Sequence, residues 1–216
     1  MNQLTNSLPR LGRFYPVLDR HSFPNSEALF RAAEELAAAG VTLLQYRNKL
    51  DDSRSVLEQS RELMQRLSDG TGNRPLRLIM NDRADLCLAA GWDGVHVGQT
   101  DLSPGSARLI LGSSRWLGVS THNPEQVEEA DQSPADYIAI GPVFSTVSKA
   151  NPDPVIGLEG LRVARGLTHK PLVAIGGITR QNCRAVIDAG ADSVAVISDL
   201  IRQPGKSAEE FLCILE

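Results

Sequence analysis

Eight short and nearly continuously apolar segments recur along the whole chain, and this repetition constrains the fold more than any other feature. Each segment is rich in β-branched residues, as expected of a parallel strand that is covered on both faces. We predict strands over Phe14–Leu18, Val41–Tyr46, Leu76–Met80, Gly94–Val97, Trp116–Val119, Tyr137–Ile140, Leu172–Ile175 and Ser193–Val196. The sequence therefore predicts a parallel sheet.

The segments between these strands have the spacing of helices. Leu29, Ala33 and Leu36 share one face of a helix that Asn25 or Ser26 can cap. The other helices are expected around Val56–Leu67 and over Asp82–Ala90, Ser103–Leu111, Pro124–Ala130, Leu158–Leu167, Thr179–Ala189 and Ala208–Leu215. The chain thus alternates strand and helix from end to end.

Eight such units in 216 residues favour an α/β fold of the closed (β/α)8 TIM barrel type over an open sheet. No Gly-x-Gly-x-x-Gly follows the first strand, which argues against a dinucleotide-binding fold. No linker or low-complexity tract divides the chain. We expect a single compact domain, with residues 1–12 as an N-terminal extension.

Charge and composition exclude several classes of function. Lys plus Arg total 22 and Asp plus Glu total 26, so a general nucleic-acid-binding surface is not expected. No apolar run approaches the roughly 20 residues of a membrane span. The three cysteines, Cys87, Cys183 and Cys213, fit neither a disulfide framework nor a zinc knuckle. With no signal-peptide core in the first ten residues, the sequence favours a cytoplasmic protein.

In a barrel of this type, side chains just beyond the strand ends converge on one mouth. After the second predicted strand, alternation places Gln45, Arg47 and Lys49 on one side and Tyr46 on the other. Two cations and an amide at the mouth suit a ligand with several anionic oxygens. A merely solvated strand end is the alternative.

The third and fourth predicted strands are followed by Asn81, Asp82 and Asp101. On adjacent strands the two carboxylates can share one hard cation, of which a partly hydrated or phosphate-bound Mg²⁺ is the best match. Alternatively, Asp82 is a helix cap and Asp101 a turn residue.

The central strands carry two histidines. His122 and Ser120 follow the fifth strand, where they can donate to an oxyanion or move a proton. His96 alternates with Val95 and Val97, so it faces the mouth of the barrel or is a satisfied core residue. Both histidines are possible site residues.

A second anion site is indicated on the far side of the barrel. Glycines and a helix N-terminus after strands seven and eight commonly hold phosphate in this fold. The candidates here are Thr146, Ser148, Gly177, Ile197 and Ser198, and Lys149 closes the loop after strand six. Two anionic substrates, one with Mg²⁺, indicate group transfer with a diphosphate leaving group.

The motifs as a set resemble the thiamine phosphate synthase (thiamine-phosphate pyrophosphorylase) family. They match in order and spacing over nearly the whole domain: QYRNK at 45–49, ND at 81–82, GVHVGQTD at 94–101, GVSTH at 118–122, DYIAIGPVFSTVSK at 136–149, AIGGI at 174–178 and VAVIS at 194–198. The resemblance implies a (β/α)8 transferase that condenses 4-amino-2-methyl-5-(diphosphooxymethyl)pyrimidine with 4-methyl-5-(2-phosphooxyethyl)thiazole to thiamine phosphate and diphosphate.

The resemblance also assigns residues. It implies that Gln45, Tyr46, Arg47, Asn48, Lys49, Asn81, Ser120 and Lys149 bind the pyrimidine diphosphate, with Arg47, Lys49, Ser120 and Lys149 acting in catalysis. Asp82 and Asp101 would bind Mg²⁺, and Thr146, Val147, Ser148, Gly177, Ile197 and Ser198 would hold the thiazole phosphate. The expected partners are two small phosphorylated substrates, with no nucleic acid and no membrane; the sequence leaves the oligomeric state open.

Three other functions compete with this one. A related thiazole tautomerase shares the phosphate site and uses a histidine at the position of His122, but has no need of Arg47, Lys49, Asp82, Asp101 and Lys149 together. A non-catalytic thiamine-phosphate binding protein would be expected to lose one of these groups. An unrelated phosphate-binding barrel enzyme would not need the aspartate pair.

Overall fold

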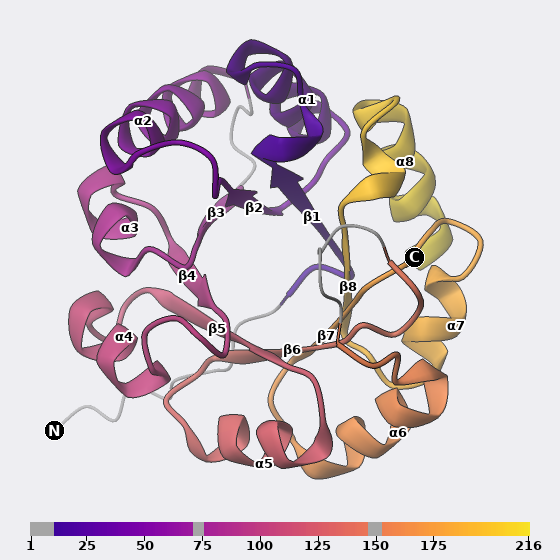
Figure 1. Cartoon of the computed structure of the whole chain (residues 1–216). Helices are drawn as coiled ribbons and strands as arrows, with labels where there is room; N and C mark the ends of the chain where they lie inside the picture. Colours follow the sequence, from indigo (N-terminus) through magenta and orange to yellow (C-terminus); the bar gives the residue numbers. More distant parts are fainter. Residues whose placement is uncertain (1–10, 71–75, 147–152) are drawn as a thin grey trace, which may run out of the picture.

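The computed structural model describes residues 11–70, 76–146 and 153–216, which form a closed parallel barrel surrounded by helices (Figure 1). The strands pair in sequence order, and β1 pairs with β8 to close the barrel. They are β1 (Phe14–Asp19), β2 (Leu43–Arg47), β3 (Arg77–Asn81), β4 (Gly94–Val97), β5 (Trp116–Thr121), β6 (Tyr137–Ile140), β7 (Leu172–Ile175) and β8 (Ser193–Val196). The predicted (β/α)8 fold is confirmed.

A helix follows each of these strands. The helices are α1 (Ser26–Ala38), α2 (Ser53–Gly70), α3 (Ala84–Ala90), α4 (Pro104–Leu111), α5 (Pro124–Gln132), α6 (Gly157–Leu167), α7 (Cys183–Asp188) and α8 (Pro204–Leu215), with short 3-10 turns η1 (Arg20–Ser22) and η2 (Ser198–Leu200). Asn25 caps α1 by accepting from the Ala28 amide at 2.9 Å.

The predicted boundaries differ from the observed ones at a few ends. Helix α8 begins at Pro204 and not at Ala208, because proline is well suited to the first helical turn. Helix α7 begins at Cys183 and not at Thr179, because Asn182 accepts from the Thr179 amide at 2.8 Å and closes a turn before the helix. Of the expected N-terminal extension, residues 1–10 lie outside the described part of the chain.

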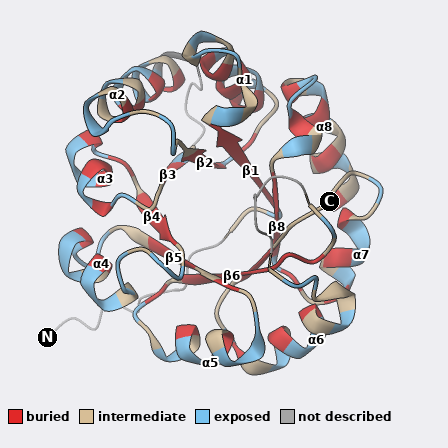
Figure 2. Ribbon diagram, viewed as in Figure 1, coloured by how far each residue is buried: buried red, intermediate tan, exposed pale blue. Residues whose placement is uncertain are grey.

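Two apolar layers hold the barrel together. Alternation along β1 sends Phe14 and Leu18 outward against the helices, and Tyr15 and Val17 into the barrel. Figure 2 shows the resulting pattern, with buried strands and buried inner faces on the surrounding helices. The inner layer fills the lower barrel with side chains such as Ile79, so the open space lies at the carboxyl ends of the strands.

Candidate active site

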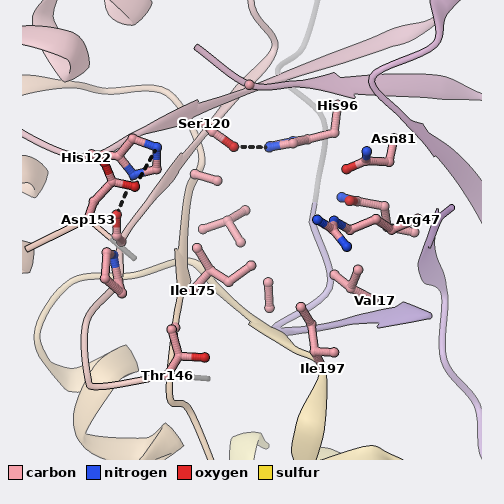
Figure 3. Close-up of a pocket in the computed structure, with 18 of the residues that line it drawn as sticks. Val17, Arg47, Asn81, His96, Ser120, His122, Thr146, Asp153, Ile175 and Ile197 are labelled. Atoms are coloured by element: carbon pink, nitrogen blue, oxygen red, sulfur yellow. Dashed lines mark hydrogen bonds and ion pairs between the residues drawn. The ribbon is translucent and has the colours of Figure 1, made fainter. Parts of the chain in front are cut away.

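A cavity of about 400 Å³ opens at the carboxyl ends of the strands (Figure 3). Arg47 and Asn81 reach it from one side, and His122 with Asp153 reaches it from the opposite side. Its size is that of a small-molecule site. The cavity is the place where the sequence predicted that polar residues would converge.

The side chains of Gln45, Arg47 and Lys49 all line the cavity, as alternation along β2 predicted. The Arg47 guanidinium is held by Asp19, whose Oδ2 lies 2.5 Å from Nη1. Asp19 is buried at the end of β1. The positive charge of Arg47 is therefore fixed at the mouth rather than free to move with solvent.

Tyr46 and Asn48 lie on the other face of the chain and do not line the cavity. The Tyr46 ring packs near Trp92 beneath the helices, and its hydroxyl donates 2.5 Å to Gln59. Asn48 donates to the Tyr46 hydroxyl at 2.8 Å. Their side chains form hydrogen bonds at the base of the β2–α2 loop, and the substrate contact implied for them by the family resemblance stays a prediction.

Asp82 and Asp101 meet at the rim of the cavity beside Lys49. Lys49 Nζ lies 2.9 Å from Asp82 Oδ2, and Asp101 Oδ2 accepts from the Gly98 amide at 2.8 Å. Burial raises the pKa of the Asp82 carboxyl, and neighbouring Asp101 raises it further, whereas Lys49 lowers it. Asp82 has a φ of 63°, the only positive φ outside glycine among the described residues. The predicted aspartate pair is thus brought together.

His96 points into the barrel and is fully partnered, so both interpretations of this residue hold at once. Its Nε2 lies 2.8 Å from Ser120 Oγ and its Nδ1 lies 3.1 Å from the Tyr137 hydroxyl. Burial lowers the pKa of the imidazole to about 4, against a small opposing effect of Asp101. The ring is therefore neutral near pH 7.

His122 also lines the cavity. Its Nδ1 donates 2.7 Å to the Gly141 carbonyl, and its Nε2 lies 3.5 Å from a carboxylate oxygen of Asp153. Gln126 accepts from the His122 backbone amide at 2.8 Å. Sequence reasoning missed Asp153 and Gln126, because nothing in the sequence marks a loop aspartate or a helix glutamine as a cavity residue.

The far side of the cavity has the features of a phosphate site. Thr146, Gly177, Ile197 and Ser198 all line it. Gly177 has a φ of 63°, and a Cβ there would lie 2.5 Å from the Ser145 carbonyl oxygen. Only glycine fits this close approach of two loops. The predicted residues Val147, Ser148 and Lys149 lie outside the described residues.

A model of the family "Thiamine monophosphate synthase" matches residues 14–200, which is most of the barrel. The chain belongs to the thiamine monophosphate synthase family. It is accordingly a transferase of thiamine biosynthesis that forms thiamine phosphate, and the function expected from the sequence is confirmed at this level.

Individual thiamine-phosphate synthases are similar over nearly all of the chain. The protein of that name from Koribacter versatilis is 56% identical over 209 residues, covering 95% of this chain and 97% of the relative. The one from Agrobacterium fabrum is 45% identical and covers 77% of each. The solved thiamine phosphate pyrophosphorylase from Pyrococcus furiosus superimposes with a TM-score of 0.81 at 33% identity, covering 94% of this chain and 95% of that one.

Two kinds of feature, a cluster of at least three metal-ligating side chains and a membrane-spanning helix, are absent from the described residues. No three His, Cys, Asp or Glu side chains in the described ranges are grouped so that they could hold a metal by themselves. Within the same ranges, no helix is both long and apolar enough to cross a membrane.

Proposed function

We propose that this synthase binds 4-amino-2-methyl-5-(diphosphooxymethyl)pyrimidine and 4-methyl-5-(2-phosphooxyethyl)thiazole in the one cavity and joins them to thiamine phosphate and diphosphate. The observation that carries the proposal is the convergence of Arg47, Lys49, Asp82 and Asp101 on the side formed by β2 to β4. A glycine-lined loop region with Gly177 faces them from β7. The diphosphate of the pyrimidine substrate matches the first side, and the phosphate of the thiazole substrate matches the second.

The reaction needs stabilisation of a leaving group more than it needs a nucleophile. The aminopyrimidine breaks its own C–O bond, the electron pair leaves with the diphosphate, and the thiazole nitrogen lone pair captures the carbocation to form the C–N bond. No proton is transferred in these steps. The protein contributes by holding Arg47 and Lys49 against the developing negative charge and by aligning the second substrate.

The contact between Ser120 and His96 is not built as an activated nucleophile. In a Ser–His–Asp arrangement a carboxylate supports the histidine, which then removes the serine proton. Here the second nitrogen of His96 faces the hydroxyl of Tyr137. With its pKa lowered to about 4 by burial, the imidazole is also a weak base. The site therefore favours dissociation over covalent catalysis.

The proposed roles follow the two sides of the cavity. Gln45, Asn81 and Ser120 bind the pyrimidine diphosphate, and Arg47, Lys49 and Lys149 stabilise the leaving group. The thiazole phosphate binds at the set formed by Thr146, Val147, Ser148, Gly177, Ile197 and Ser198. His122 also lines the cavity and stays a possible site residue.

Asp82 and Asp101 fit Mg²⁺, because the ion commonly takes one or two carboxylates and completes its shell with water and substrate phosphate. The pair supplies two carboxylates as oxygen ligands and leaves the other positions of the ion to water and phosphate. Both residues line the cavity on the side proposed for the diphosphate. When bound, Mg²⁺ would neutralise charge on the departing diphosphate. Lys49 already offsets part of the negative charge of Asp82.

The test is a product assay with the purified protein, both phosphorylated precursors, and either Mg²⁺ or a chelator. We expect thiamine phosphate only with the metal, and none from Asp82→Ala or Asp101→Ala. Asp85→Asn is the matched control, since Asp85 pairs with Arg83 on the surface of α3. Product in the presence of the chelator would remove the metal from the proposal.

The assay also separates the synthase from the thiazole tautomerase. Folded protein that makes no thiamine phosphate but exchanges protons on the thiazole phosphate would be a tautomerase. We further propose a cytoplasmic location, which the three free cysteines support. Fractionation of cells expressing the tagged chain checks it.

A further inference from the structure

Four hydrogen bonds link five polar side chains across the floor of the cavity. Gln45 Nε2 donates to the Tyr15 hydroxyl at 2.9 Å, which lies 3.0 Å from the Tyr137 hydroxyl. The Tyr137 hydroxyl lies 3.1 Å from His96 Nδ1, and His96 Nε2 lies 2.8 Å from Ser120 Oγ. Apart from Ser120 at the cavity edge, these side chains are buried.

The number of protons in this row of hydrogen-bonded side chains is fixed. Burial raises the pKa of both Tyr15 and Tyr137 well above its ordinary value, so both phenols keep their protons. Both ring nitrogens of His96 face hydroxyl groups, Tyr137 at Nδ1 and Ser120 at Nε2, so a ring with one proton completes both hydrogen bonds. Each member of the chain therefore donates once, and the first donor determines every later one.

The first donor is Gln45, because its amide nitrogen faces Tyr15 and can only donate. Tyr15 then accepts from Gln45 and donates to Tyr137. Tyr137 in turn donates to Nδ1 of His96, whose proton is left on Nε2 and given to Ser120 Oγ. Ser120 accepts this bond, which leaves its own hydrogen for the cavity that it lines.

The geometry points to Tyr15 and Tyr137 as positioning residues that order the protons of this chain, fix His96 as its Nε2–H tautomer, and turn the Ser120 hydrogen toward the cavity. The amide oxygen of Gln45 is left to accept at the opposite end. The order of the protons is argued from geometry alone, whereas its role toward the substrate rests on the proposed function. The Ser120 donor then suits the diphosphate oxygens, and the Gln45 acceptor suits the exocyclic amine of the pyrimidine.

Close packing holds two of these hydrogen-bonded side chains, His96 and Tyr137, in place. The rings of His96 and Tyr137 lie 5.5 Å apart between centroids. Gly118 on β5 makes room for them, since a Cβ there would lie 2.1 Å from Tyr137 Cζ and 2.4 Å from His96 Nδ1. The glycine thus lets both rings approach the strand.

The first test is the tautomer of His96 in the substrate-free protein. Long-range ¹H–¹⁵N spectra at neutral pH distinguish the two ring nitrogens, and His96→Gln assigns the signal among the four histidines. We expect the proton on Nε2 in the unchanged protein and a mixture of tautomers in Tyr137→Phe. A proton on Nδ1 in the unchanged protein, or the same spectrum in Tyr137→Phe, would overturn the inference.

The second test is a kinetic double-mutant cycle. Tyr137→Phe should lower kcat about tenfold with a smaller change in KM, because the donor to the leaving group is misdirected. In a Ser120→Ala background the same change should alter kcat less than about twofold, because Tyr137 acts through Ser120. Additive effects would refute the coupling.

Two further variants keep this test decisive. Tyr15→Phe should reproduce the effect if Tyr137→Phe does not fold. Thr121→Val is the matched control, since it removes a buried hydroxyl beside Ser120 that donates only to the Ala139 carbonyl. Because the spectra need no substrate, an ordered His96 in a protein without synthase activity would refute the proposed function and leave the proton order standing.

Discussion

Asp19 is buried at the end of β1, and its Oδ2 lies 2.5 Å from Nη1 of Arg47 at the end of the neighbouring strand. Strand register brings the two residues together, because Asp19 and Arg47 are direct partners in the β1–β2 pairing. The carboxylate therefore holds the guanidinium at the mouth before any substrate arrives.

Arg47→Ala should lower kcat about 100-fold, the usual effect of removing one charged donor to a developing anion. It should also destabilise the fold by about 3 kcal/mol, because the buried Asp19 carboxylate loses its cation and keeps the His21 amide as its donor. Urea unfolding and saturating-substrate kinetics measure the two effects. Arg31→Ala is the control, since Arg31 forms an exposed pair with Glu27. Unchanged turnover in Arg47→Ala would contradict the proposed role.

Asp19→Asn tests positioning apart from charge at the cavity. The amide keeps the shape of the carboxylate but no longer holds the guanidinium as an ion pair. We expect kcat to fall about tenfold, because a small misplacement of an electrostatic group is costly in turnover. If Arg47 acts without this support, kcat in Asp19→Asn will equal that of the unchanged enzyme.

The neutral His96 makes stability depend on pH. Its pKa is about 4 in the folded protein and 6.5 in an ordinary environment. Between these values the unfolded chain binds a proton that the folded chain does not, so the free energy of unfolding falls as pH decreases from 6.5 toward 4 and is flat above 6.5. At pH 5 the loss is about 2 kcal/mol.

Urea unfolding at neutral pH and at pH 5 measures this loss, and His96→Asn provides the reference. The variant should lose about 2 kcal/mol less than the unchanged protein over the same interval, since other groups titrate equally in both. Equal losses in the two proteins would show that His96 does not titrate this way.

Gly177→Ala should impair the proposed thiazole phosphate site. The new Cβ would lie 2.5 Å from the Ser145 carbonyl oxygen at a φ of 63°, so backbone strain of about 1–3 kcal/mol is expected. KM for the thiazole phosphate should rise more than KM for the pyrimidine diphosphate. Gly166→Ala is the control, because an added Cβ there meets nothing within 4 Å beyond the neighbouring backbone of its own helix. Equal changes in the two KM values would argue against the assignment.

The sequence predicted the fold and much of the cavity because both follow from alternation. Period-two spacing sent Gln45, Arg47 and Lys49 to the mouth, and adjacency of strands β3 and β4 brought Asp82 near Asp101. These are consequences of the backbone, which a sequence pattern expresses directly.

The remaining features of the site depend on side-chain direction and on loops, neither of which follows a periodic sequence pattern. Tyr46 and Asn48 matched a family motif yet lie outside the cavity, where they bond to each other. The inward position of Tyr15 in β1 was accessible to the same alternation argument, but its link to Gln45 and Tyr137 depends on depth within the barrel. No pattern along one strand records that depth.

The left-handed backbone of Asp82 implies a conflict between durability and turnover. Its φ of 63° suits glycine better than a residue with a Cβ. Asp82→Gly would relieve this strain and remove a half-buried carboxylate whose charged form is disfavoured by burial. If Asp82 holds Mg²⁺ as proposed, such a variant would outlast its parent on heating while making no product, so selection for thermal resistance alone would draw this enzyme away from catalysis.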